Sequence, residues 1–83
     1  RVLEAPVSIS EDASHWTVVF GRDLGATQLR MLDAAGREVW SGLVQAEEGY
    51  AYRVARPDAA GTYLMQVVGN NGQWAVPLLN AGF

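Results

Sequence analysis

The sequence predicts an all-β fold in which two antiparallel sheets pack face to face as a sandwich. Between Gly25 and Gly69 glycines recur every 6 to 12 residues, close to the spacing of about 8 to 12 residues between turns in β-sandwich proteins. The short runs between them are rich in β-branched and aromatic residues. Several runs alternate in polarity: within residues 27–33, Leu29 and Met31 share one face, while Gln28 and Arg30 share the other. Each such strand is expected to place one face on a core and the other in water.

Seven runs are predicted to be strands of a single domain that spans residues 1–83. They are Val7–Ser10, Trp16–Phe20, Thr27–Asp33, Glu38–Leu43, Tyr50–Ala55, Thr62–Val68 and Gln73–Leu79. The segment Leu43–Ala60 also contains alanines and glutamates that favour a helix. Gly49 and Pro57 interrupt it, however, and its apolar residues follow a period of two, with Tyr50, Tyr52 and Val54 on one face. Strands are therefore expected there as well.

Turn chemistry predicts how these strands connect. Asp33-Ala-Ala-Gly36 has Asp at the first and Gly at the fourth position of a type I turn, which predicts a tight hairpin. Asn71-Gly72 predicts a second hairpin, because both residues accept a positive φ angle. Residues 57–61 form a further turn. Pro77 cannot donate to a sheet ladder, so the last strand is expected at an edge or with a bulge.

Composition excludes several classes of function. Six arginines, no lysine and nine acidic residues give a net charge of −3, which argues against a nucleic-acid-binding surface. The absence of cysteine excludes a disulfide framework, a thiolate metal site and a cysteine nucleophile. No apolar run approaches the roughly 18 residues of a membrane-spanning helix, and no signal peptide is visible. Because the chain opens at Arg1 rather than Met, we expect it to be a piece of a longer precursor.

The sequence gives little support for catalysis, and no enzyme, cofactor or metal site is expected. His15 is the single histidine, and neither Ser10 nor Ser14 lies in a nucleophile motif. The acidic pairs at 11–12 and 47–48 lack the alternating oxygen ligands of a calcium loop. Gly69-Asn-Asn-Gly72 precedes a strand rather than a helix, so it is interpreted as a turn and not as a phosphate loop.

Aromatic residues are numerous for a chain of this length: Trp16, Trp40, Trp74, Tyr50, Tyr52 and Tyr63. Large rings are an effective source of core area in a small domain without disulfides, so most are expected to be buried. Trp40 and Trp74 are the expected exceptions, since Trp40 follows Val39 in one strand and one of the two must face outward. Exposed rings that stack on sugars would instead make the domain a carbohydrate-binding accessory module.

Two motifs resemble those of a known family. The family is the type IX secretion system C-terminal sorting domain, type A. Its V-x-I-Y-D segment resembles Leu29-Arg-Met-Leu-Asp33, and its D-x-x-G-R-x-V segment resembles Asp33-Ala-Ala-Gly-Arg-Glu-Val39. Ala60-Gly-Thr-Tyr-Leu-Met-Gln-Val67 resembles that family's S-G-x-Y-x-x-x-V segment, at a similar distance along the chain. The resemblance extends over roughly residues 5–80. It implies a seven-stranded immunoglobulin-like antiparallel β-sandwich.

The resemblance also implies a function. Such domains lie at the carboxyl end of proteins exported by Gram-negative bacteria and carry a cargo domain from the periplasm through an outer-membrane translocon. A sortase-like peptidase then usually removes them, and the cargo is secreted or held at the cell surface. The matching residues are Asp33, Gly36, Arg37, Val39, Gly61, Tyr63 and Val67. Asp33 and Gly36 are expected to form a turn and Gly61 to allow a bend, while Val39, Tyr63 and Val67 face the core.

The two ends of the chain depart from the family pattern. Glu4-Ala-Pro-Val7 stands in place of a P-N-P-like opening, and residues 73–80 lack the lysines of the usual closing strand. We expect a translocon to bind this last strand by strand addition, with Trp74, Val76, Leu78 and Leu79 as recognition residues. Whether the domain is cleaved or retained stays open. So does the possibility of a structural immunoglobulin-like module, or of a spacer that packs on a neighbouring catalytic domain.

Overall fold

The computed structural model describes residues 6–70 and 72–80, and within them the fold is all-β with no helix. The strands are β1 (Val7–Glu11), β2 (His15–Phe20), β3 (Gly25–Leu32), β4 (Glu38–Ala46), β5 (Ala51–Ala55), β6 (Gly61–Gly69) and β7 (Gly72–Asn80). All seven predicted strands are therefore confirmed, with ends that shift by at most three residues. The segment that competed as a helix contains the end of β4 and the whole of β5.

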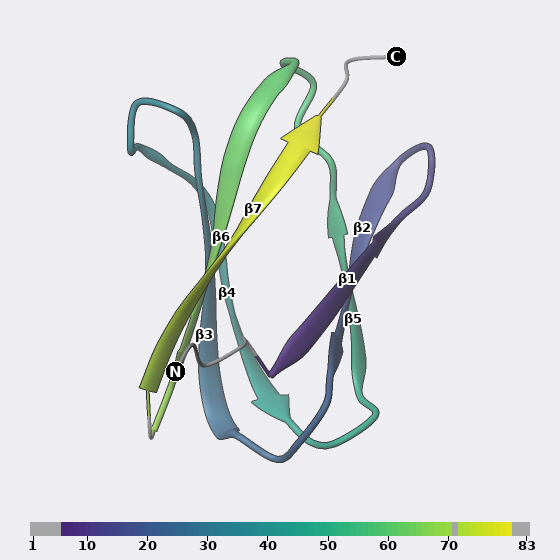
Figure 1. Cartoon of the computed structure of the whole chain (residues 1–83), viewed down its shortest axis with the longest axis vertical. Helices are drawn as coiled ribbons and strands as arrows, with labels where there is room; N and C mark the ends of the chain where they lie inside the picture. Colours follow the sequence, from purple (N-terminus) through teal and green to yellow (C-terminus); the bar gives the residue numbers. More distant parts are fainter. Residues whose placement is uncertain (1–5, 71, 81–83) are drawn as a thin grey trace, which may run out of the picture.

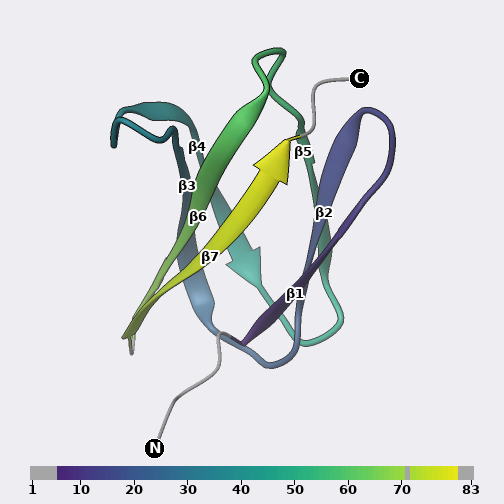
Figure 2. The ribbon, with the colours of Figure 1, turned by 45° about the horizontal axis from the view of Figure 1, so that its top comes forward.

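The strands form an immunoglobulin-like sandwich of two antiparallel sheets. One sheet has the order β1-β2-β5 and the other has the order β4-β3-β6-β7 (Figures 1 and 2). The free edges of β1 and β7 border one side of the sandwich, where residues of both strands line a common groove. The free edges of β4 and β5 border the opposite side, where Trp40 of β4 meets Tyr52 of β5 with ring centroids 5.9 Å apart.

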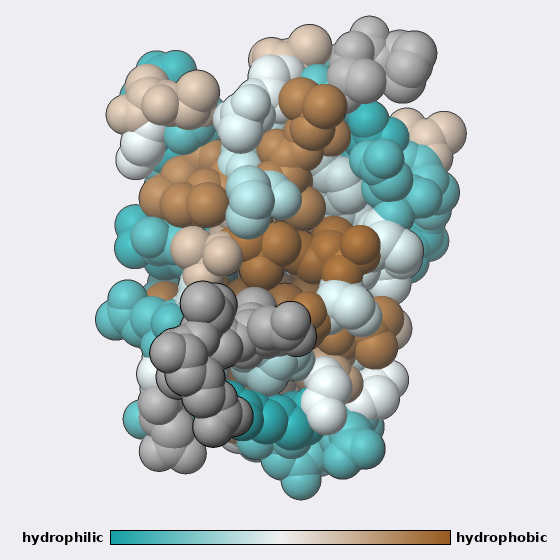
Figure 3. Space-filling model, in the orientation of Figure 1, coloured by the Kyte–Doolittle hydropathy of each residue, from teal (hydrophilic) through white to brown (hydrophobic). Residues whose placement is uncertain are grey.

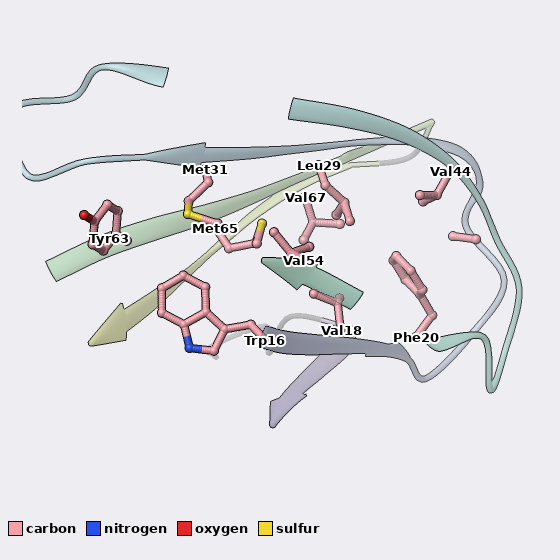
Figure 4. Packing of buried hydrophobic residues seen from close by; sticks show 11 residues of the cluster. Trp16, Val18, Phe20, Leu29, Met31, Val44, Val54, Tyr63, Met65 and Val67 are labelled. Atoms are coloured by element: carbon pink, nitrogen blue, oxygen red, sulfur yellow. The ribbon is translucent and has the colours of Figure 1, made fainter. Parts of the chain in front are cut away.

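The core lies between the sheets and is filled by alternate residues of the central strands (Figure 4). Trp16, Val18 and Phe20 of β2 project from one sheet, and each is at most 1% exposed. Leu29 and Met31 of β3, with Tyr63, Met65 and Val67 of β6, project from the other. The predicted inward positions of Leu29, Met31, Tyr63 and Val67 are thus confirmed. This alternation of burial fixes the register of each strand, because a shift by one residue would turn all of its buried apolar side chains to the solvent.

The hairpin between β3 and β4 forms as predicted. Oδ1 of Asp33 accepts hydrogen bonds from the backbone N–H groups of Ala35 and Arg37, both at 2.9 Å. The carbonyl of Asp33 accepts from the N–H of Gly36 at 2.9 Å, and Gly36 has a φ of 85°. A residue with a side chain is strained in that left-handed conformation, so Gly36 is required by the turn itself.

Asp33 should make the domain acid-sensitive. The N–H of Arg37, then that of Ala35 and the charge of Arg37, hold the pKa of the Asp33 carboxyl below its usual 3.8. Because the folded-state pKa is lowered, the stabilisation is present above about pH 4 and is lost as the pH falls through the folded-state pKa. We expect Asp33→Asn to lower the melting temperature at neutral pH and to converge on the wild type in acid. Thermal melts against pH, with Asp58→Asn as an exposed control, test this; an offset that is constant with pH would contradict it.

A corner between β5 and β6 ties the two sheets together. The hydroxyl of Tyr63 donates to the carbonyl of Ala59 at 2.7 Å, which is the tyrosine corner of immunoglobulin-like sandwiches. Asn80, at the end of β7, donates to the carbonyls of Pro57 and Ala59 at 2.7 and 2.9 Å. Gly61 opens β6 with a φ of 146°, a conformation that favours glycine, and it lies just after a bend at residues 58–59. The corner is held by side chains from both β6 and β7.

The hairpin between β6 and β7 also forms, with Gly69 opposite Gly72. Asn71, for which a positive φ is predicted, lies outside the described residues. Pro77 lies in β7, which is an edge strand, and the pairing of β7 with β6 runs without a register shift. Of the two alternatives predicted for Pro77, the edge position is the one found.

The predicted core position of Val39 is wrong, because Val39 is 46% exposed. The pairing of β3 with β4 shifts between Met31 and Leu32, so that Met31 pairs with Trp40 but Leu32 pairs with Glu38. This bulge leaves Val39 as the extra residue of β4, and Trp40 takes the inward position instead. A one-residue bulge thus reverses the orientation that simple alternation predicts.

The aromatic residues divide differently from the prediction. Trp16 and Tyr63 are buried, but Tyr50 is 43% exposed, so its predicted core position is wrong. Trp40 and Trp74 are half-buried, as is Tyr52. Both tryptophans cover a glycine of their own strand: a Cβ on Gly42 would lie 2.9 Å from the Trp40 ring, and one on Gly72 would lie 3.2 Å from the Trp74 ring. These glycines therefore give the rings a flat backbone on which to pack.

Candidate functional site

The two motifs that are separate in the sequence lie together at one end of the sandwich, at the top of Figure 1. They meet because β3, which leads into the Asp33 turn, is paired with β6. The turn and the start of β6 line a mostly apolar hollow of about 290 Å³. Its lining residues are Leu32, Asp33, Ala34, Gly36, Thr62, Tyr63, Leu64 and Pro77. The hollow is thus built from both motifs and from the last strand.

An outer apolar row, made of Val39, Leu32, Leu64 and Pro77, runs across the solvent face of the four-stranded sheet. Leu32 is paired with Leu64, and Leu64 is paired with Pro77. Val39 lies at the bulge next to the residue paired with Leu32. The neighbours Met31 and Met65 point inward and are buried, so Leu32 and Leu64 point outward. The row therefore crosses β4, β3, β6 and β7 at the end where the motifs meet.

The outer edge of β7 presents backbone groups that no strand of the described residues covers. Because Pro77 has no N–H and the register is unbroken, Leu64 and Pro77 form a non-hydrogen-bonded pair. Alternation then turns the N–H and C=O groups of Gln73, Ala75 and Leu79 away from β6. In a non-hydrogen-bonded pair of an edge strand, the missing N–H of Pro77 costs no hydrogen bond within the sheet. This edge can accept an added strand.

The four predicted recognition residues divide between the two faces of β7. Trp74, Val76 and Leu78 lie on the inward face and are half-buried, whereas Leu79 faces outward and is 69% exposed. Trp74 also carries the guanidinium of Arg22 over its ring, 5.4 Å from the centroid. The remaining exposed part of the inward face borders β1. Figure 3 shows a largely apolar surface between β7 and β1.

The groove between β1 and β7 has a volume of about 220 Å³. It is lined by Ile9, Ser10, Glu11, Trp16, Pro77, Leu78 and Leu79. Sites for drug-sized ligands have volumes of roughly 300–1,000 Å³. The groove is therefore better matched to one or two side chains of an extended segment than to a small molecule.

Comparison of the chain with family models, with curated proteins and with solved structures found no match.

The polar cluster around His15 forms the turn between β1 and β2. Oδ1 of Asp12 accepts from the N–H groups of Ser14 and His15 at 2.9 and 2.8 Å, and these two bonds, with the charge of Arg53, lower the pKa of the Asp12 carboxyl. Oγ of Ser14 lies 2.7 Å from Nδ1 of His15. A hydrolase relay places the histidine between serine and carboxylate, whereas here Asp12 contacts the serine side. The cluster acts as a turn, and Asp12 is its acceptor.

The two acidic pairs make separate contacts in the structure. Glu11 contacts the Trp16 indole N–H at 3.3 Å, while the N–H of Glu48 donates to Asp23 at 2.8 Å. Among residues 6–70 and 72–80, no three His, Asp or Glu side chains are grouped closely enough to hold a metal ion. The same residues contain no helix that is long and apolar enough to cross a membrane.

Two structural features are not predicted by any pattern in the sequence. The outer apolar row depends on the bulge at Met31 and Leu32, which no turn residue marks. The second feature is Arg56, whose side chain is only 11% exposed. Its guanidinium donates to the carbonyl of Asp12 at 2.7 Å and to Oδ1 of Asn80 at 2.8 Å, and it lies over the Trp16 ring. A charged residue flanked by Ala55 and Pro57 gives no periodic signal that would reveal these contacts.

Proposed function

We propose that this domain is a non-catalytic sorting signal of the type IX kind, recognised by an outer-membrane secretion translocon. The observation that carries the proposal is the free outer edge of β7, which lies beside the outer apolar row. An added strand would gain backbone hydrogen bonds from the edge, and its side chains would contact the row. The proposal rests on these surfaces together with the two motifs.

Val39 supports recognition rather than folding alone. A motif residue in the core needs no explanation beyond stability. Val39 is 46% exposed on the solvent face, so burial does not account for a valine there. In the outer apolar row it extends a surface that begins at the β7 edge. Asp33, Gly36, Gly61, Tyr63 and Val67, in contrast, are explained by the turn, the corner and the core.

The resemblance supplies the partners of this proposed function. They are the translocon, a sortase-like peptidase and a cargo domain that precedes the sorting domain in the same precursor. The cargo would then be secreted or held at the cell surface after passing through the periplasm of a Gram-negative bacterium. Within this scheme the domain is bound and performs no reaction.

The test is export of a reporter. Residues 1–83 are fused to the carboxyl end of a periplasmic reporter in a host that has type IX machinery, and reporter activity is compared between periplasm and medium. We expect export of the wild-type fusion, and a loss of at least about tenfold with Ala75→Pro, which removes an outward N–H of β7 without breaking a bond to β6. Leu43→Pro on the β4 edge is the matched control and should export normally.

A second variant tests the outer apolar row without touching the edge. Val39→Asp places a charge on an already exposed side chain, so the melting temperature should change little while export falls. A fusion that stays in the periplasm rejects the sorting proposal. Export that survives Ala75→Pro and Val39→Asp alike rejects recognition through this surface.

A further inference from the structure

The opposite side of the sandwich carries a second long free edge, that of β4, and no proline interrupts it. The β1 and β5 edges are only five residues long and contain Glu11 and Arg53, while Pro77 removes one outward N–H from the otherwise free β7 edge. β4 has nine residues, no proline, and no charge after Glu38. Glu38 itself is neutralised by Arg30 at 2.7 Å. Natural sheets usually block an edge of this length, because it can pair with another strand.

The hydrogen-bond alternation fixed by Pro77 extends across the sheet to β4. Gln66 is paired with Ala75 of β7, whose backbone groups point outward, so the N–H and C=O groups of Gln66 point toward Arg30 of β3. Those of Arg30 point back toward β6, and those of its neighbour Leu29 therefore point toward Gly42 of β4. The carbonyl of Ala46 points toward β3, as this alternation requires, because it accepts a hydrogen bond from the N–H of Leu24 on that side. The N–H and C=O groups of Ser41, Leu43 and Gln45 therefore point outward, away from the sheet.

Exposed apolar side chains gather on the same side. Among residues 6–70 and 72–80, the exposed large hydrophobic residues are Val39, Leu43, Tyr50 and Leu79. Val39 and Leu43 belong to β4, and Tyr50 directly precedes β5. Leu43 is the most exposed of them, at 81%. Tyr50, Tyr52 and Trp40 form a line of neighbouring rings beside the edge, with centroids 6.5 and 5.9 Å apart.

We propose that the β4 edge binds the β4 edge of a second copy of this chain, in an antiparallel pair with its two-fold axis at Leu43. The pair joins two four-stranded sheets into one continuous sheet. Leu43 lies opposite its copy, and Ser41 lies opposite Gln45 of the other chain. Each of these pairs exchanges two backbone hydrogen bonds, because these residues carry the outward N–H and C=O groups.

The side chains of β4 match a copy of themselves in this register. On the core face, Trp40 lies opposite Ala46, and Gly42 lies opposite Val44, so a large residue meets a small one in each pair. On the solvent face, the two leucines form an apolar cross-strand pair. Residues 39–46 carry no charge, so no like charges face each other across the axis. A charged peptide would find no opposite charge among residues 39–46, which favours a second copy over an acidic or basic peptide.

The oligomeric state tests this pairing. Sedimentation of the purified domain over a concentration series should show a rise from 9.0 kDa toward about twice that mass. Leu43→Lys places two ammonium groups directly opposite each other and should shift the dissociation constant by at least about tenfold. The matched control, Leu79→Lys, makes the same change on the other edge and should dimerise like the wild type. Both side chains are exposed, so both variants should keep the wild-type circular dichroism.

The register has its own test, since the chain contains no cysteine. Opposite residues of a hydrogen-bonded pair have Cα atoms about 5.5 Å apart, within disulfide range. Leu43→Cys should therefore cross-link to itself on mild oxidation, whereas Ser41→Cys should cross-link only when mixed with Gln45→Cys. A monomer at every concentration overturns the proposal, as does a dimer that Leu43→Lys leaves unchanged or that Leu79→Lys weakens equally. Self-linking of Ser41→Cys in place of Leu43→Cys also overturns it.

Discussion

Replacement of Trp16 by alanine is expected to cost about 3–5 kcal/mol of unfolding free energy. Trp16 is 1% exposed and lies at the centre of the core, where its ring contacts Tyr63 at a centroid distance of 6.0 Å. The substitution removes that contact and also the surface on which Arg56 lies, 5.9 Å from the ring centroid. A domain of this length has roughly 4–12 kcal/mol of stability in total, so the variant should be near or past its limit.

Urea unfolding followed by far-ultraviolet circular dichroism measures this loss. The melting temperature should fall by about 12–40 °C, since each kcal/mol corresponds to about 4–8 °C in a domain of this size. Leu79→Ala serves as the control: it removes a side chain that is 69% exposed and should stay within about 0.5 kcal/mol of the wild type. A Trp16→Ala variant as stable as Leu79→Ala would mean that the core is not organised around this ring.

The fold could be predicted because its signals are local. Asp33 and Gly36 form a turn through contacts within five residues, and each central strand alternates between buried and exposed positions. The predictions for Val39 and Tyr50 failed for nonlocal reasons. Val39 is turned outward by a bulge in the pairing of β3 with β4. Tyr50 lies outside β5, and its ring stacks on Phe20 of another strand, with a centroid distance of 6.3 Å.

The candidate site was predictable only in part, because edges are a property of sheet order. Pro77 indicates an edge from the sequence alone, and β7 is one. Nothing in the composition of residues 38–46 says that β4 is also an edge, since the same residues would suit a central strand. The strand order β4-β3-β6-β7 is set by which inward faces pack together, and that depends on the whole chain. Surfaces built across strands therefore appear only once the order is known.

Removal of Asn80 is expected to destabilise the domain by about 2–4 kcal/mol, although it is the last described residue of β7. Asn80 is 4% exposed and makes three hydrogen bonds, two to the carbonyls of Pro57 and Ala59 and one from Arg56. Asn80→Ala leaves the Pro57 carbonyl and one end of the guanidinium without these bonds. The Ala59 carbonyl keeps its bond from Tyr63 at 2.7 Å, so the loss there is smaller.

A double-mutant cycle separates the contact between Arg56 and Asn80 from the rest of this corner. Arg56→Ala and Asn80→Ala should be non-additive by about 1 kcal/mol or more, because each removes the other's partner. Arg37→Ala is the matched control, since its side chain is 82% exposed and its ion pair with Asp33 is on the surface. Arg37→Ala should lower the free energy of unfolding by less than about 1 kcal/mol, and its effect should be additive with that of Asn80→Ala.

Amide exchange should rise in β7 of Asn80→Ala before it rises in β2, because Asn80 joins the end of β7 to the corner whereas β2 lies in the core. Equal exchange in both strands would mean that Asn80 supports global stability and does not specifically hold the end of β7.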